Sequence, residues 1–255
     1  MVEYKNIFKA FDAPVLAGVK LRVETGETMS VVGHSGTGKS VLLKTTIGLI
    51  TPDFGDVYID GVSVFQGDRK TLERIRRKVG YVFQNAALFD SMTVFENVSQ
   101  GLPEDELKRS RFREVLRRVA EALELVNLDT RKVLSKLPSE LSGGMRKRVG
   151  LARAIVGRPE ILLYDEPVTG LDPVNATVVH ELIQRLADEL GVTSIVVTHD
   201  IEGALPISDH VAMLDKGRIR FVGTPDQFRG SEDVLVRAFL ERDAMTDSNT
   251  VLEAV

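Results

Sequence analysis

The 255-residue sequence contains no cysteine. Without thiols the chain can form no disulfide framework, no thiolate metal site and no cysteine nucleophile. It also has no excess of positive charge, because 33 Lys and Arg residues face 37 Asp and Glu residues and the formal net charge is −4. This balance gives no electrostatic support to general nucleic-acid binding, so we expect no nucleic acid among the partners.

Long apolar runs are missing as well. No stretch reaches the roughly 18 uninterrupted apolar residues of a membrane-spanning helix, and residues 1–5 lack the apolar segment of a signal peptide. If the protein works at a membrane, we therefore expect another chain to supply the span. Apolar residues (43%) and charged residues (27%) occur in ordinary globular proportions, and the length suits one large core or an α/β core with a helical insert.

A glycine-rich octapeptide follows a short apolar segment and precedes an apolar segment suited to a helix, residues 41–50. The pattern G-x-x-x-x-G-K-S in this context predicts a phosphate-binding loop, in which backbone N–H groups and a helix N-terminus hold phosphate. Lys39 then reaches the β- and γ-phosphates, and the Ser40 hydroxyl ligates Mg²⁺. The alternative is an ordinary glycine turn. The octapeptide consists of Gly33, His34, Ser35, Gly36, Thr37, Gly38, Lys39 and Ser40.

Apolar patterns elsewhere predict an α/β fold around this loop. Alternating residues in the first sixty positions predict a small antiparallel β layer, and short apolar runs later in the chain predict buried core strands. A hairpin is expected around Lys216 and Gly217. The predicted strands are residues 15–24, 57–59, 79–83, 161–164 and 194–198.

A helical insert is predicted at approximately 92–157, inside a domain that spans residues 1–242 and precedes a polar tail at 243–255. Within the insert we expect one long amphipathic helix over residues 104–127, with solvated Arg and Lys on its outer face. Its apolar side chains recur at helical spacing. They are Phe112, Val115, Leu116, Val119, Leu123 and Val126.

Three predicted strands end at polar residues. Gln84 follows residues 79–83, Asp165 and Glu166 end the run that starts at Ile161, and His199 follows Thr198. Because ligands of parallel α/β sheets lie at the carboxyl ends of the strands, we expect these residues at the same sheet edge as the phosphate loop.

Each of these residues suits a step of phosphate chemistry. Asp165 is placed to hold Mg²⁺, and Glu166 can act as general base for an attacking water, a role that contributes roughly 10²–10⁴-fold. His199 can contact a γ-phosphate or that water, and Gln84 can ligate Mg²⁺ or position water. The alternatives are a turn or helix cap at the two carboxylates, since Pro167 follows, and a structural histidine.

A second candidate anion site precedes a helix that is expected to begin around Arg146. Ser142, Gly143 and Gly144 present free N–H donors at a helix N-terminus. The alternative is a simple serine cap with a glycine turn. Two such sites can bind two phosphates in one chain, or share one nucleotide between two copies.

Taken in order, these segments resemble an ATP-binding-cassette (ABC) ATPase subunit. The motifs span most of the chain in family order: Walker A, Q-loop, signature, Walker B, D-loop and H-loop. Their residues are Gly33 to Ser40, Gln84, Leu141 to Met145, Ile161 to Glu166, Gly170 to Asp172, and His199.

The resemblance implies a P-loop NTPase (ABC ATPase) core with an antiparallel β layer and a helical subdomain, ATP and Mg²⁺ as cofactors, and ATP hydrolysis coupled to transport. It implies a head-to-tail pair in which Ser142, Gly143 and Gly144 act in trans on ATP held by Walker A of the other copy. Phe11 matches the aromatic that stacks on adenine; the alternative is a core phenylalanine. It also implies attachment through a transmembrane permease at the cytoplasmic face of the inner membrane.

The signature departs from the family pattern, because Met145 stands where glutamine is usual. Together with the segments 83–98 and 165–173, this is similar to the ATPases of MCE-type systems, which move phospholipid or other lipids between membranes with a permease and an MCE-domain protein. The alternative is the ATPase of a nutrient or amino-acid importer. Residues 86–89 could seat a coupling helix of the permease or pack in the core.

Overall fold

The computed structural model describes residues 1–241, so the end of the predicted domain at residue 242 and the predicted tail at 243–255 lie outside the described residues. The chain divides into two compact units. The first contains Met1–Gly67 and the described residues from Ile195 onward, and the second contains Asp68–Ser194. The limits predicted for the helical insert and the domain stay predictions.

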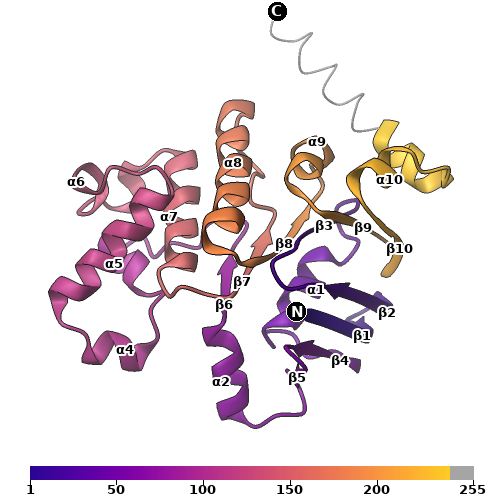
Figure 1. Cartoon of the computed structure of the whole chain (residues 1–255), viewed down its shortest axis with the longest axis horizontal. Helices are drawn as coiled ribbons and strands as arrows, with labels where there is room; N and C mark the ends of the chain where they lie inside the picture. The colour runs from indigo at the N-terminus through magenta and orange to yellow at the C-terminus, as the bar shows by residue number, and fades with distance from the viewer. Residues whose placement is uncertain (242–255) are drawn as a thin grey trace, which may run out of the picture. The chain divides into compact units, whose positions relative to one another are not determined.

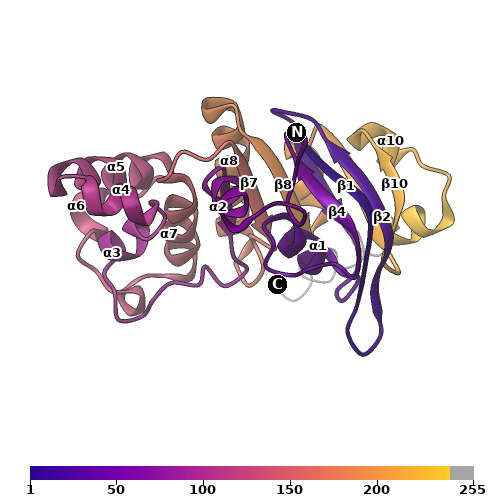
Figure 2. The same ribbon diagram turned by 90° about the horizontal axis from the view of Figure 1, so that it is seen from below.

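The first unit contains the antiparallel layer that the alternating residues predict. Its strand order is β2-β1-β4-β5, and each neighbouring pair is antiparallel. The layer also holds β1, a strand that the sequence analysis did not anticipate, and a hairpin joins β1 to β2 (Figure 2). Its strands are β1 (Val2–Ala10), β2 (Pro14–Val23), β4 (Phe54–Ile59) and β5 (Val62–Ser63).

A second group of strands in the first unit has the order β10-β9-β3-β8. Strand β3 leads into the phosphate loop, is buried at all five residues, and pairs in parallel with β9. Strands β9 and β10 form the predicted hairpin, with the turn at Lys216 and Gly217. The strands are β3 (Thr28–Val32), β8 (Thr193–Thr198, whose first two residues belong to the second unit), β9 (His210–Asp215) and β10 (Arg218–Gly223).

The helices of the first unit pack against these strands. Helix α1 lies beside the antiparallel layer (Figure 2), where the buried Tyr4 hydroxyl is 2.6 Å from the Thr46 hydroxyl. Phe228 and Phe239 belong to a core cluster next to β9. The helices are α1 (Lys39–Thr46), α9 (Ile201–Ala204), a 3₁₀ turn (Leu205–Ile207), α10 (Pro225–Arg229) and residues 234–241.

The second unit joins a parallel pair of strands, β6 and β7, to a group of helices (Figure 1). Helix α7 packs against both α3 and α5. The strands are β6 (Val79–Val82) and β7 (Ile161–Asp165). The helices are α2 (Arg69–Arg77), α3 (Val94–Ser99), α4 (Glu104–Arg109), α5 (Phe112–Leu125), α6 (Thr130–Val133), a 3₁₀ turn (Pro138–Glu140), α7 (Gly143–Ile155) and α8 (Pro173–Leu190).

The prediction of one long helix over residues 104–127 is wrong, because the chain forms α4 and α5 there with a break between them. Ser110 and Arg111 are extended, with ψ of 142° and 146°. Residues 108–111 (Lys-Arg-Ser-Arg) carry no apolar side chain to bury, and serine hydrogen-bonds its own backbone well outside helices. The apolar spacing from Phe112 to Val126 therefore belongs to α5 and its C-cap residue.

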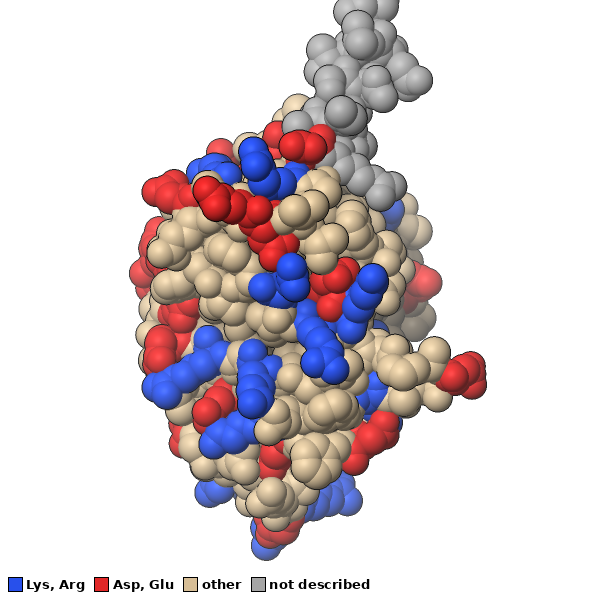
Figure 3. Space-filling model, turned by 90° about the vertical axis from the view of Figure 1, so that its right-hand side faces the viewer, with Lys and Arg blue, Asp and Glu red and all other residues tan. Residues whose placement is uncertain are grey.

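No helix among residues 1–241 is both long enough and apolar enough to cross a bilayer. On the face that Figure 3 shows, Lys and Arg side chains are interspersed with Asp and Glu side chains. Opposite charges that alternate in this way produce no single-sign field on that face to attract a polyanion.

Candidate functional site

The phosphate loop connects β3 to α1 in the first unit, and its glycines are required by the backbone. Gly38 is the N-cap of α1 with φ of 100°, a left-handed backbone conformation that residues other than glycine rarely adopt. A Cβ atom added to Gly33 would lie 2.4 Å from the Leu214 carbonyl oxygen. The first turn of α1 has no side-chain cap, so its N–H groups remain suited to an anion.

Lys39 is the first residue of α1 and is only 5% exposed. Its ammonium donates to the Gly33 carbonyl oxygen at 2.7 Å and to the His34 carbonyl oxygen at 3.1 Å. The side chain thus folds back along the loop and places a positive charge beside the backbone of Gly33 and His34.

Residues 234–241 contact the phosphate loop, which the sequence analysis missed. The His34 ring meets the Phe239 ring edge to face, with the ring centroids 4.8 Å apart. Phe239 is 5% exposed and belongs to the core cluster. No local pattern in residues 234–241 indicates the phosphate loop as their neighbour.

Phe11 and His199 also lie in the first unit. Phe11 sits between β1 and β2 and is 60% exposed, so the interpretation of it as a core residue is wrong. The Lys9 ammonium lies 5.4 Å from the centre of its ring. His199 directly follows β8 and is exposed. The roles of both residues toward a nucleotide stay predictions.

In the second unit, Asp165 is the last residue of β7 and Glu166 directly follows it, and both residues are buried. The Tyr81 hydroxyl, from β6, donates to Asp165 Oδ2 at 2.8 Å and so holds that carboxylate in place. The Thr169 hydroxyl donates to Glu166 Oε2 at 3.3 Å. Glu166 has φ of 49°, a left-handed backbone that costs a non-glycine residue about 1–2 kcal/mol.

Gln84 directly follows Phe83, past the end of β6, and is exposed. Its backbone carbonyl accepts a hydrogen bond from the Lys147 ammonium, which also lies 3.5 Å from the Glu166 carbonyl oxygen. Burial lowers the pKa of Lys147, and the negative charge of Glu166 partly opposes this effect. Within the second unit, one side chain therefore links two predicted site residues. The sequence analysis did not identify Lys147.

The predicted signature segment opens α7, which begins at Gly143 rather than around Arg146. The Ser142 hydroxyl accepts a hydrogen bond from the Met145 N–H at 3.3 Å, so this serine does cap the helix. A Cβ on Gly143 would meet nothing closer than 3.9 Å, whereas one on Gly144 would lie 2.5 Å from Asn175 Oδ1. Gly143 therefore leaves the first turn open.

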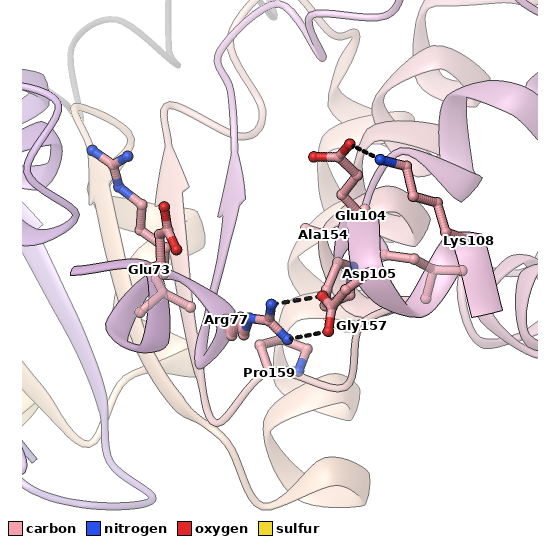
Figure 4. A pocket seen from close by; sticks show the side chains of 13 residues that line it. Glu73, Arg77, Glu104, Asp105, Lys108, Ala154, Gly157 and Pro159 are labelled. Carbon is pink, nitrogen blue, oxygen red and sulfur yellow. Dashed lines mark hydrogen bonds and ion pairs between the residues drawn. The ribbon is translucent and has the colours of Figure 1, made fainter. Parts of the chain in front are cut away.

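A pocket of about 570 Å³ in the second unit lies away from these residues (Figure 4). Val79 and Pro159 line it, so it is found where β6 and β7 begin, whereas the predicted residues follow the ends of these strands. Its charges neutralise each other, since Arg77 binds Asp105 at 2.6 Å and Lys108 binds Glu104. This pocket is not the predicted nucleotide site.

The oxygen donors predicted for Mg²⁺ are chemically suited to it. Ser40, Gln84 and Asp165 offer a hydroxyl, an amide and a carboxylate, the hard ligands that Mg²⁺ takes together with substrate phosphates. Among residues 1–241 no group of three or more His, Asp or Glu side chains forms a metal site without a nucleotide. A metal held jointly with phosphate fits this donor set.

Comparisons with known proteins place the chain among ATP-binding cassettes. A family model described as ABC transporter matches residues 16–169. The chain is 41% identical to the sulfate/thiosulfate import ATP-binding protein CysA of Bradyrhizobium diazoefficiens, over 94% of this chain and 68% of that protein. It is 36% identical to the intermembrane phospholipid transport system ATP-binding protein MlaF of Haemophilus influenzae, over 96% of this chain and 91% of that protein.

Solved structures show the same fold. The dimeric structure of a post-hydrolysis state of the ATP-binding cassette MJ0796, bound to ADP and phosphate, matches with a TM-score of 0.79 and 34% identity, over 88% of this chain and 99% of that chain. This likeness confirms the predicted fold class, a P-loop NTPase α/β core with an antiparallel layer and a helical subdomain.

Proposed function

The chain belongs to the ABC transporter family as an ATP-binding subunit that hydrolyses ATP, and we propose that it powers the movement of lipid, in particular phospholipid, between membranes. The observation that carries the proposal is the signature Ser142 to Met145, in which methionine replaces the usual glutamine. The likeness to MlaF, which extends over 91% of that protein, supports it.

We propose that the predicted motif residues divide the chemistry of hydrolysis between them. The phosphate loop and Lys39 bind the triphosphate, and Glu166 takes the proton of the attacking water as general base. Gln84 and His199 orient that water and contact the γ-phosphate. Mg²⁺, held by Ser40, Gln84 and Asp165, would neutralise developing charge on the phosphate oxygens.

The proposed working unit is a head-to-tail pair of copies with ATP between them. Ser142, Gly143 and Gly144 of each copy then serve the nucleotide that the phosphate loop of the other copy holds. Phe11 is the residue proposed to stack on adenine. The dimeric MJ0796 cassette supports this arrangement. The space at Gly143 supports it too, because a Cβ atom there would meet nothing closer than 3.9 Å and a helix N-terminus suits an anion.

A transmembrane permease and an MCE-domain lipid-binding protein are the proposed partners, and the permease would hold the chain at the cytoplasmic face of the inner membrane. Residues 86–89 suit a permease contact only in part. Phe89 is 52% exposed, whereas Ala86 is 3% exposed and packs against α7. The exposed end of this segment is therefore the proposed seat of a coupling helix.

Purification of the native complex through a tag on this chain tests the proposal. We expect mass spectrometry to identify a permease and an MCE-domain protein, and lipid extraction to recover phospholipid in amounts comparable to the complex. Recovery of a permease with a solute-binding protein and no phospholipid would instead establish the alternative, an importer of a small nutrient. The likeness to CysA, a sulfate/thiosulfate import protein, is the observation that favours this alternative.

A further inference from the structure

Helix α7 carries two buried or half-buried cations that hold the backbone of the segment after β6. Lys147, 8% exposed, donates to the Gln84 carbonyl oxygen. Arg153, six residues further along the helix, donates to the Ala87 carbonyl oxygen at 2.7 Å and to the Ala86 carbonyl oxygen at 2.5 Å. The backbone carbonyl groups of three residues in the segment 84–87 thus accept hydrogen bonds from side chains of one helix.

The held segment has a backbone that its own residues do not favour. Ala86 has φ of 58° and Ala87 has φ of 46°, both in the left-handed region. Alanine gains nothing there from its side chain, so external contacts must maintain the conformation. The carbonyl groups that accept from Arg153 belong to these two residues.

Between the two cations, α7 approaches the segment closely. A Cβ on Gly150 would lie 3.1 Å from the Ala86 Cβ and 3.4 Å from the Ala86 carbonyl oxygen. Lys147, Gly150 and Arg153 recur every three residues, which places them on one side of the helix. The contact between α7 and residues 84–87 therefore extends along the helix from Lys147 to Arg153 and is more than a single hydrogen bond.

Lys147 also contacts the segment after β7, because its ammonium lies 3.5 Å from the Glu166 carbonyl oxygen. Glu166 has a left-handed backbone as well, with φ of 49°. The N-terminus of the same helix carries the signature residues, starting at the cap Ser142. One rigid element thus joins the signature to the backbone of both Gln84 and Glu166.

We propose that Lys147 and Arg153 are positioning residues through which α7 sets the places of Gln84 and Glu166 for hydrolysis. The proposal rests on the roles proposed above for Gln84 and Glu166. Neither cation needs to touch the nucleotide, since each acts on backbone carbonyl groups. A displacement of the signature end of α7 then moves both site segments together.

The test compares Lys147→Met, Lys147→Gln and Lys147→Arg in the full-length chain, with Arg148→Met as matched control. Arg148 is the next residue of α7 and donates to the Asn127 carbonyl oxygen instead. We expect Lys147→Met to lower kcat 10- to 100-fold while KM for ATP stays within about threefold, because the phosphate loop is unaltered. Lys147→Arg, which keeps a cation and several donors, should retain at least a third of kcat, and Arg148→Met should stay within twofold.

Hydrogen exchange adds a readout that does not depend on turnover. Amides of residues 84–90 should exchange at least tenfold faster in Lys147→Met than in the wild-type chain, and at the wild-type rate in Arg148→Met. If Lys147→Met fails to fold, the comparison uses Lys147→Gln, which keeps a neutral amide as donor, with an expected 3- to 10-fold loss of kcat. Wild-type kcat in the folded variant, or equal losses in Lys147 and Arg148 variants, would overturn the proposal.

Glu166→Gln, measured alongside, separates this proposal from the one on which it rests. Full turnover in Glu166→Gln would remove Glu166 from the role of base, whatever the Lys147 variants do. Loss of turnover in Glu166→Gln combined with normal kcat and normal exchange in Lys147→Met would leave the base assignment intact and refute only the positioning role.

Discussion

At the scale of single residues, the phosphate loop depends on a buried cation. Lys39 is 5% exposed, and its ammonium donates to two carbonyl oxygens of the loop, that of Gly33 at 2.7 Å and that of His34 at 3.1 Å. A triphosphate would offer this ammonium charged oxygen acceptors, which form stronger hydrogen bonds with it than neutral carbonyl oxygens do. We therefore expect phosphate oxygens to replace the two carbonyl oxygens as acceptors of the Lys39 ammonium when ATP binds.

Lys39→Ala should weaken ATP binding by about 2–3 kcal/mol, roughly 30- to 150-fold, because it removes charge-assisted hydrogen bonds to phosphate. Titration calorimetry with ATP and Mg²⁺ measures the change. Lys44→Ala, in the last turn of the same helix, is the control and should bind normally. Unchanged affinity in Lys39→Ala would contradict the assignment of the loop.

At this scale, the sequence did not indicate which residues other than glycine would have a left-handed backbone. Gly38 was predictable, because the loop pattern requires glycine there. Ala86, Ala87 and Glu166 have positive φ without being glycine. Nothing in their residue types indicates this conformation, and each costs about 1–2 kcal/mol that contacts elsewhere must offset.

At the scale of elements, α7 is defined by its first turn. Ser142 caps it, and two glycines follow where most helices carry side chains. The two positions differ in the space for a side chain, since a Cβ atom at Gly143 would have room, whereas one at Gly144 would lie against Asn175. The Asn175 amide donates to Asp172 Oδ2 at 2.6 Å, so its side chain cannot move aside without losing that bond.

We therefore expect Gly143→Ala and Gly144→Ala to have opposite effects on stability. Gly143→Ala should be neutral or raise stability by up to about 1 kcal/mol, because alanine favours the helix. Gly144→Ala should lower stability by about 1–3 kcal/mol through overpacking and the lost Asn175 hydrogen bond. Thermal unfolding of the nucleotide-free chain gives both values, and equal melting temperatures would show that Asn175 yields freely.

At the scale of the whole molecule, the predicted motifs are distributed over both compact units. The phosphate loop, Phe11 and His199 belong to the first unit, and Gln84, the signature, Asp165 and Glu166 belong to the second. No unit holds a complete set. The roles proposed for these residues in hydrolysis therefore draw on both units, and the proposed trans role of the signature requires a second copy.

The proposed pairing predicts an ATP-dependent change of mass. Glu166→Gln, which we expect to bind ATP without cleaving it, should change from one copy to two when ATP and Mg²⁺ are added, as measured by light scattering after gel filtration. The double variant Lys39→Ala, Glu166→Gln should remain a single copy under the same conditions. A Glu166→Gln chain that keeps the same mass with and without ATP would count against a shared nucleotide.

The sequence by itself determined the phosphate loop, the antiparallel layer and the polar ends of the core strands. These features depend on local rules: glycine where φ is positive, alternation along strands, and free N–H groups at a helix start. The sequence did not reveal the break between α4 and α5, because the helical spacing of apolar residues continues on both sides of the four polar residues 108–111.

Only the tertiary structure decided which residues hold the site segments in place. Lys147 and Gln84 are 63 positions apart, and the Phe239 ring reaches His34 from the far end of the described chain. Such contacts arise when separate elements bury their surfaces against each other, and no local pattern encodes the partner. The carbonyl groups of Ala86, Ala87 and Glu166 are acceptors for the same reason, because the cations that contact them come from α7, which is distant in the sequence.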